Sequence, residues 1–171
     1  FRHPQWWIDR VRIAYPAQWE EVLRAGKERP PMTLRVSVRR ASVQSYLEKL
    51  ADAGLHERAL GGAAVLLARA CRIDALPGFA EGEVSVQDAA AQAAAPLLIG
   101  AGLPAGSRVL DACAAPGGKT AHLLELADLD VLALDSDAQR LTRVQDTLDR
   151  LHLKATLRAA DARRPDSWWD G

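Results

Sequence analysis

The sequence has few cysteines, no long apolar run and no excess of charge of one sign. Its two cysteines, Cys71 and Cys113, stand far apart without C-x-x-C spacing, which argues against a disulfide framework and a structural zinc site. No apolar stretch approaches the roughly 20 residues of a membrane helix, and the first residues do not resemble a signal peptide. With 22 basic and 22 acidic residues, the net charge shows no bias toward nucleic acid or membrane. We therefore expect a cytoplasmic protein that binds neither a metal nor a membrane.

The length and the two ends of the sequence bear on its domain content. The 171 residues suffice for one ordinary domain, or for a small domain and part of another. An apolar fraction of 49% and a charged fraction of 26% are typical of a globular protein. The chain starts with Phe1 instead of Met and stops abruptly after Gly171, so we expect it to be a piece of a longer protein.

Residues 1–79 are predicted to form a small α+β domain. Ser42 is a good N-cap for one of its helices, and the alternating strand that precedes it is predicted to be half-buried, with Arg35 facing solvent. Periodicity divides the region into helices over 4–15, 17–27 and 43–53 and a strand over 32–38. The apolar stretch over 63–70 fits either a strand or a helix, and we favour short strands there.

The first part of this domain is locally basic. Residues 1–47 hold four acidic and nine basic side chains, the latter being Arg2, Arg10, Arg12, Arg24, Lys27, Arg29, Arg35, Arg39 and Arg40. Because Trp6, Trp7 and Trp19 are interleaved with them, contact with an RNA backbone and stacking on bases is one interpretation. A solvated helical face with core tryptophans is the other.

Residues 80–171 alternate between strand and helix patterns and are predicted to form a second domain. This alternation implies an α/β fold, a doubly wound parallel sheet with right-handed crossovers. The predicted strands cover 83–86, 107–110, 129–135 and 155–159, and two predicted helices cover 121–127 and 138–151. A third, alanine-rich helix is capped by Asp88 and runs to about Gly100 or Gly102.

A loop of small residues, Asp111–Thr120, follows the strand over 107–110 and precedes a helix. Gly117 and Gly118 carry no side chains, so backbone N–H groups and the positive end of the helix can approach a ligand. In open α/β sheets a nucleotide-like cofactor binds at this end of the first strand.

The spacing within the loop narrows the choice of ligand. Gly118-Lys119-Thr120 matches the end of the phosphate loop G-x-x-x-x-G-K-[ST], but Cys113 occupies the place of the first glycine, and G-x-G-x-x-G is missing. A nucleoside-triphosphate enzyme that uses Gly-Lys-Thr therefore remains an alternative. The loop fits better a nucleoside with a small zwitterionic tail, such as S-adenosylmethionine.

Two carboxylates complete a predicted nucleoside pocket. Asp135 ends the second strand, where a carboxylate can accept hydrogen bonds from both ribose hydroxyls. Asp161 follows the third strand and can accept one from the adenine amine.

The stretch over 109–120, Val-Leu-Asp-Ala-Cys-Ala-Ala-Pro-Gly-Gly-Lys-Thr, resembles the cofactor motif of the RNA 5-methylcytosine methyltransferases, the NOL1/NOP2/Sun family. Residues 2–7, 33–36 and 78–88 resemble its bacterial Sun/Fmu (RsmB-type) branch, which methylates 16S ribosomal RNA. The resemblance covers essentially the whole chain. It implies a partial Rossmann-like methyltransferase fold that binds S-adenosylmethionine, preceded by a small RNA-handling domain.

The resemblance also assigns residues to the cofactor. It implies that Asp135 holds the ribose and that Asp161 lies beside the adenine. The methionine and ribose side would be lined by Cys113, Ala114, Ala115, Pro116, Gly117, Gly118 and Lys119.

Three features of the family are missing from this sequence: an amino-terminal NusB-like domain, an Asp-Ala-Pro-Cys motif and a Thr-Cys motif. In the family a thiolate adds to cytosine C6, C5 then takes the methyl group, and a base removes the C5 proton. The resemblance places Cys113 in the cofactor loop, and Cys71 is a core residue, so we expect no catalytic residue in this chain. The chain alone would be inactive; a non-catalytic RNA-binding module with a vestigial cofactor fold is the other alternative.

The first strand of such a sheet is central, which leaves one apolar edge of residues 109–112 without a partner in this sequence. We expect either self-association through this edge or pairing with a further part of the protein.

Overall fold

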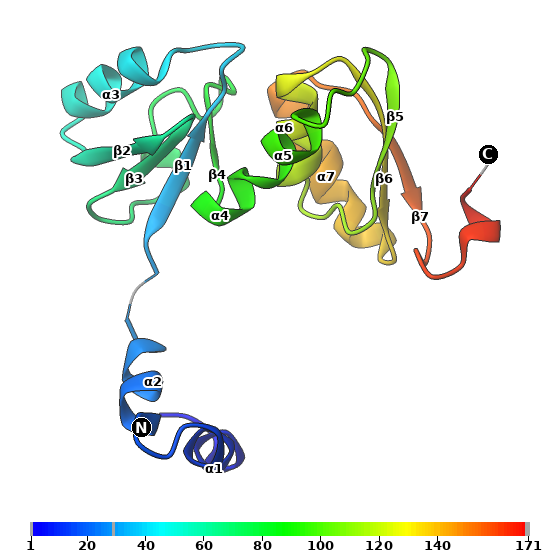
Figure 1. Ribbon diagram of the computed structural model, residues 1–171. Helices are drawn as coiled ribbons and strands as arrows, with labels where there is room; N and C mark the ends of the chain where they lie inside the picture. Colours follow the sequence, from blue (N-terminus) through cyan, green and yellow to red (C-terminus); the bar gives the residue numbers. More distant parts are fainter. Residues whose placement is uncertain (1, 29, 170–171) are drawn as a thin grey trace. The chain divides into compact units, whose positions relative to one another are not determined.

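The computed structural model describes residues 2–28 and 30–169, so Arg29 of the basic segment lies outside the described residues. The chain divides into two compact units, Phe1–Pro30 and Pro31–Gly171 (Figure 1). Within the described ranges, no helix is long and apolar enough to cross a membrane.

The first unit is a pair of helices, α1 (Gln5–Ala14) and α2 (Trp19–Ala25). Ile8, Val11 and Leu23 are buried between them, and Trp19 packs against this small cluster. Apolar residues spaced one helical turn apart on α1 therefore meet the apolar face of α2.

The second unit begins with a four-stranded antiparallel sheet in the spatial order β2-β3-β1-β4 (Figure 1). Helix α3 (Val43–Asp52) packs Tyr46 and Leu50 against it, and Ser42 caps this helix by accepting a hydrogen bond from Ser45 N at 3.0 Å. The strands are β1 (Met32–Val36), β2 (Glu57–Gly61), β3 (Ala64–Leu67) and β4 (Val84–Val86), and a 3-10 turn follows at Ile73–Ala75.

Strand β4 pairs with β1, with Leu34 opposite Val86 and Val36 opposite Val84. The antiparallel sheet thus extends past residue 80, where the sequence predicts a second domain to begin. The division into 1–79 and 80–171 stays a prediction.

The second sheet has three parallel strands in the order β5-β6-β7. Its elements are β5 (Ser107–Asp111), α6 (Gly118–Leu126), β6 (Leu129–Asp135), α7 (Ala138–Leu151) and β7 (Thr156–Ala159), followed by a 3-10 turn at Pro165–Ser167. The predicted bounds of β6 and α7 are confirmed to the residue. The parallel, Rossmann-like arrangement of strands and helices is confirmed as well.

The alanine-rich helix predicted to follow Asp88 is interrupted. It forms two pieces, α4 (Ala89–Gln92) and α5 (Ala94–Ile99), which meet at Ala93. Pro96 has no N–H with which to bond the carbonyl of Gln92, so one hydrogen bond of a continuous helix cannot form there.

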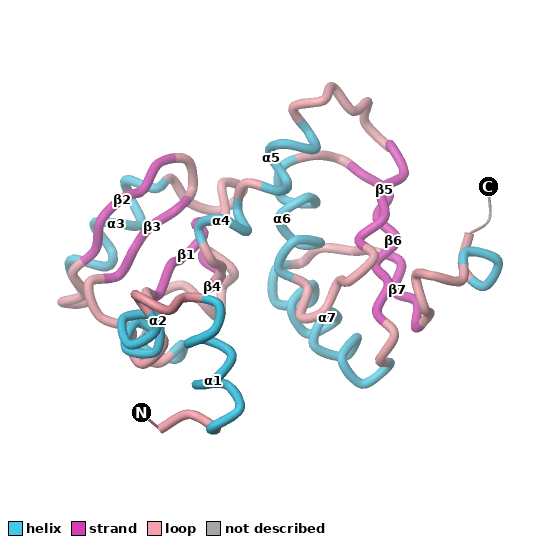
Figure 2. The backbone as a smooth tube through the Cα atoms, turned by 60° about the horizontal axis from the view of Figure 1, so that its bottom comes forward, coloured by secondary structure: helices cyan, strands magenta, loops and turns pink. Residues whose placement is uncertain are grey.

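Helices α6 and α7 lie on the same face of the parallel sheet, as Figures 1 and 2 both show. Two right-handed crossovers that proceed in one direction along a sheet place both helices on one side. Val131 and Ala133 of β6 point to this face and are buried with Val144 and Leu148 of α7.

The prediction that Arg35 faces solvent is wrong. Its side chain is 1% exposed and forms an ion pair with Glu125 of α6, with 3.0 Å between Nη2 and Oε1. Alternation along β1 identifies which side chains share a face, but it cannot show that a carboxylate of α6, 90 residues away in sequence, pairs with Arg35.

His122 on α6 is 4% exposed, and its buried Nδ1 has no hydrogen-bond partner within the described part of the chain. Burial, with a smaller contribution from the Arg35 charge, lowers the pKa of His122 from 6.5 to about 4. Between these values the unfolded chain binds a proton that the folded chain does not, so stability falls as the pH drops. We expect a loss of about 1–2 kcal/mol between pH 7 and pH 5 from this group, measured by urea unfolding.

The variant His122→Leu should show a smaller loss of stability over the same pH interval. His152→Asn is the matched control, because it removes an exposed imidazole at a left-handed position (φ 56°) that asparagine tolerates. Equal pH dependence in the wild type and in His122→Leu would contradict the assignment.

Candidate functional site

Three aspartates mark the carboxyl ends of the three parallel strands. Asp111 ends β5, Asp135 ends β6, and Asp161 follows β7. In the register of the sheet, Asp111 lies opposite Ala133 and Asp135 lies opposite Ala159. Because the strands are parallel, all three carboxylates belong to one edge of the sheet, the edge at which α/β proteins bind cofactors.

The loop between β5 and α6 is tied to the neighbouring strand. Ala114 is buried, and its N–H donates to the carbonyl of Leu134 at 2.8 Å. Gly117 has φ 101°, and a Cβ at this position would lie 3.2 Å from Val144 Cα of α7. Glycine therefore allows both the left-handed turn and the close approach of the loop to α7.

Asp135, predicted to hold a ribose, is 2% exposed and already organises the loop. One carboxylate oxygen accepts from the N–H of Ala115 at 3.3 Å, and the other accepts from the N–H of Asp137 at 3.1 Å. The guanidinium of Arg140 lies 3.5 Å from the carboxylate and also donates to the carbonyl of Ala115 at 3.3 Å. The second strand and the glycine loop are thus joined at this carboxylate.

Two loop-anchoring residues were missed from the sequence, Asp111 and Thr120. The hydroxyl of Thr120 donates to Asp111 Oδ2 at 2.7 Å, and the N–H of Cys113 donates to Asp111 Oδ1 at 3.3 Å. The available signal was an aspartate at the strand end followed nine residues later by a hydroxyl in the first helical turn.

Asp161, predicted to lie beside adenine, is paired with a cation. The side chain of Arg163 donates to both of its carboxylate oxygens, at 3.0 Å from Nε and 2.8 Å from Nη2. These hydrogen bonds lower the pKa of Asp161 to about 2. Its side chain is 32% exposed, so it is open to solvent where that of Asp135 is buried.

The remaining loop residues are divided between the surface and the interior. Cys113, Pro116 and Lys119 are exposed, whereas Ala114 and Gly117 are buried against the sheet and α7. The edge therefore offers carboxylate acceptors from Asp135 and Asp161 together with the N–H groups that begin α6. S-adenosylmethionine carries hydroxyl, amino and sulfonium groups that suit carboxylates and a carboxylate that suits N–H donors, so this set of groups fits it.

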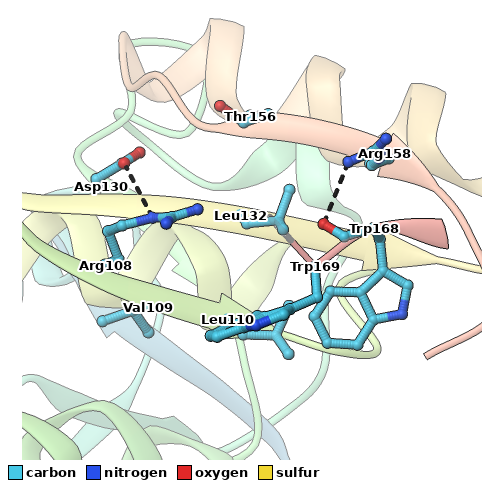
Figure 3. Close-up of a pocket in the computed structure, with 9 residues that line it drawn as sticks. All are labelled: Arg108, Val109, Leu110, Asp130, Leu132, Thr156, Arg158, Trp168 and Trp169. Atoms are coloured by element: carbon cyan, nitrogen blue, oxygen red, sulfur yellow. Dashed lines mark hydrogen bonds and ion pairs between the residues drawn. The ribbon is translucent and has the colours of Figure 1, made fainter. Parts of the chain in front are cut away.

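A separate pocket lies along the sheet instead of at its carboxyl edge (Figure 3). Leu110 and Leu132 are cross-strand neighbours that line it, and Trp168 and Trp169 lie beside them. The carbonyl of Trp168 accepts a hydrogen bond from Arg158 at 3.2 Å. None of the predicted cofactor residues lines this pocket, so we do not assign the cofactor to it.

Comparison with protein families gives two matches, one in each half of the chain. A family model described as "Methyltr_RsmF/B-like, ferredoxin-like domain" matches residues 3–74. A second, described as "16S rRNA methyltransferase RsmB/F", matches residues 103–171. The first match includes strands β1, β2 and β3, and the second includes the whole parallel sheet.

Individual relatives agree with these matches. "Ribosomal RNA small subunit methyltransferase B" of Pseudomonas putida is 51% identical over 99% of this chain, and that of Yersinia pestis is 47% identical over 98%. Among solved structures, a methyltransferase homolog from Pyrococcus horikoshii superposes with a TM-score of 0.77 and 25% identity over 97% of this chain and 55% of its own. This chain spans 39% of the length of both curated relatives.

The variant Gly117→Ala should destabilise the protein by about 1–3 kcal/mol, because alanine is strained at φ 101° and its Cβ would press on the α7 backbone. Gly118→Ala is the matched control: the nearest atom to a Cβ there is Gln87 Nε2 at 3.7 Å, an ordinary contact. Chemical denaturation of the two variants measures the difference. Equal stability would show that Gly117 is not conformationally required.

Proposed function

Because the chain belongs to the RsmB/F family of 16S ribosomal RNA methyltransferases, we propose that its protein transfers a methyl group from S-adenosylmethionine to C5 of a cytosine in 16S ribosomal RNA. In this proposal the chain supplies the cofactor-binding edge and an RNA-handling surface, and it acts in the cytoplasm. When bound, S-adenosylmethionine supplies the methyl group.

The observation that carries the proposal is the junction at Asp135. A buried carboxylate accepts a hydrogen bond from the loop N–H of Ala115, so the predicted ribose ligand and the predicted methionine loop belong to one edge. In the proposed complex Asp135 holds the ribose hydroxyls, and Cys113 to Lys119 line the methionine and ribose side of the cofactor. Asp161 accepts a hydrogen bond from the adenine amine, so that its carboxylate oxygens serve both this amine and Arg163.

The same junction disfavours the nucleoside-triphosphate alternative. A triphosphate in the Gly-Lys-Thr loop would bring several negative charges toward the Asp135 carboxylate. Lys119 is exposed in the first turn of α6, but the glycine that would shape an anion cradle is replaced by Cys113. S-adenosylmethionine, with its cationic sulfonium, has the charge that this edge favours.

The nucleophile of the proposed reaction is assigned to a part of the protein other than this chain. The chemistry requires a thiolate that adds to cytosine C6. Cys113 lies in the loop that would surround the cofactor, and Cys71 packs against the core of the antiparallel sheet. Both positions suit structural roles better than attack on a base.

The first unit supports the RNA part of the proposal. Trp6 and Trp7 are 61% and 41% exposed, so they are not core residues, and their rings make an edge contact at 5.8 Å. Arg2 and Arg10 are exposed on the same unit. Exposed indole rings and exposed guanidinium groups on one unit suit stacking on unpaired bases and contact with phosphates.

The variant Asp135→Asn should weaken binding of S-adenosylmethionine by roughly 1–3 kcal/mol, because it removes the charge and one acceptor of the proposed ribose contact. Isothermal titration with S-adenosylmethionine and, separately, with ATP measures this. The matched control is Asp130→Asn, an exposed aspartate on the same strand at its other end. Binding of ATP without binding of S-adenosylmethionine would overturn the proposal, and an unchanged affinity in Asp135→Asn would overturn the ribose role.

Transfer of a labelled methyl group to 16S ribosomal RNA by the full-length protein separates the enzyme from a non-catalytic RNA-binding module. We expect label on cytosine C5 with the wild type and much less with Asp135→Asn. RNA binding without any transfer would favour the module.

We also propose that this chain by itself self-associates through β5, which pairs only with β6 in the described part of the molecule. The N–H and C=O groups on its other edge can then pair with a second copy. Sedimentation over a concentration series should show dimers, and Leu110→Lys should shift them toward monomer. Leu97→Lys, at a 76% exposed position on α5, is the control. If the wild-type chain is a monomer at all concentrations and unfolds cooperatively, the proposed self-association is wrong.

A further inference from the structure

The side chain of Arg35 extends from the antiparallel sheet to the helix that begins at the cofactor loop. It is 1% exposed, and the side chain of Glu125 opposite it is 3% exposed. Nε donates to Oε2 at 3.1 Å and Nη2 donates to Oε1 at 3.0 Å, so the ion pair is bidentate. Such a pair fixes the plane of the guanidinium as well as its position.

The third nitrogen of this guanidinium, Nη1, binds different partners. Nη1 donates to the backbone carbonyl of Gly118 at 2.9 Å and to the side-chain oxygen of Gln87. Gly118 is the first residue of α6 and follows Gly117, so the carbonyl that Arg35 holds belongs to the loop itself. A glycine pair has no side chains to restrict it, so contacts from outside must fix its conformation.

The antiparallel sheet, in turn, fixes Arg35 and Gln87. The N–H of Gln87 donates to the carbonyl of Thr33 at 3.1 Å. The side chain of Gln92 donates to the carbonyls of Leu34 at 3.1 Å and of Gln87 at 3.0 Å. A continuous set of hydrogen bonds therefore connects strand β1 to the first turn of α6.

We propose that Arg35 is a positioning residue for the cofactor: its bond to Gly118 holds the amino-terminal turn of α6 where the methionine part of S-adenosylmethionine binds. This inference rests on the proposed function. A shift of a few tenths of an ångström in the Gly118 region would misalign the N–H groups that face the ligand, and binding depends steeply on such alignment. Arg35 itself does not touch the cofactor.

A purely structural role for Arg35 predicts something different. In that case every variant would lose cofactor affinity in proportion to its loss of stability. The ion pair and the Gly118 contact use different nitrogens, so they can be separated by mutation. Replacement of both members of a buried ion pair by apolar residues is often neutral for stability, although it removes the bond to Gly118.

The experiment measures S-adenosylmethionine affinity by titration and stability by urea unfolding in the full-length protein for four variants. Glu125→Gln weakens the ion pair but leaves the Gly118 bond, so we expect lower stability and unchanged affinity. Arg35→Met with Glu125→Leu should restore much of the stability that Arg35→Met alone loses, yet keep an affinity about tenfold below the wild type. Arg35→Lys should give an intermediate affinity, because one ammonium cannot serve both partners.

The inference would be overturned if the affinity for S-adenosylmethionine falls in proportion to stability across the four variants. It would also be overturned if the double variant binds S-adenosylmethionine like the wild type. If the double variant does not fold, the comparison of Arg35→Lys with Glu125→Gln tests the same point. We expect weaker binding of S-adenosylmethionine in Arg35→Lys and unchanged binding in Glu125→Gln. A wild-type protein that fails to bind S-adenosylmethionine would overturn the proposed function and this inference with it. Normal wild-type binding that no variant changes would overturn the inference alone.

Discussion

The arrangement of the second unit depends on a buried guanidinium, that of Arg35. An isolated charge in a protein interior is strongly unfavourable, so its burial requires that Glu125 of α6 face β1 with both carboxylate oxygens. That requirement fixes the position of α6 relative to β1. Because α6 begins at the glycine loop, it also fixes where the loop is relative to the strand that carries Arg35.

A second arginine makes the corresponding contact from α7. Arg150 donates to the carbonyls of Phe79 at 2.7 Å and Val84 at 3.1 Å, and its guanidinium lies 4.0 Å above the Phe79 ring. The helices after β5 and β6 are thus both joined to strands of the antiparallel sheet through arginine side chains, α6 to β1 and α7 to β4. Within the second unit, the antiparallel sheet and the edge proposed to bind the cofactor consequently share one frame, in which a displacement of either is opposed by these polar contacts.

The predictions that succeeded from sequence rest on local information. The ranges of β6 and α7 follow from an apolar run and from a helical spacing that ends at Leu151. The prediction that Arg35 faces solvent was wrong because alternation along one strand cannot show a partner 90 residues away. The break at Ala93 was missed because alanine content outweighed the missing N–H of Pro96. The features that could not be predicted from the sequence therefore depend on packing between elements. They include most of the contacts that hold the site residues in place.

The two aspartates proposed to hold the nucleoside differ in how far they are organised before a ligand binds. Asp135 is buried and holds the loop through Ala115, so the position of its carboxylate is set by the fold. Asp161 is open to solvent, and its pKa is held low by Arg163, a partner on the same exposed turn. A ligand that reaches this edge meets a fixed acceptor at the ribose position and an adjustable one at the base position, because the Arg163 contact can rearrange at little cost when it is screened by water. In the proposed complex the ribose contact therefore needs less rearrangement of the protein than the contact with the base.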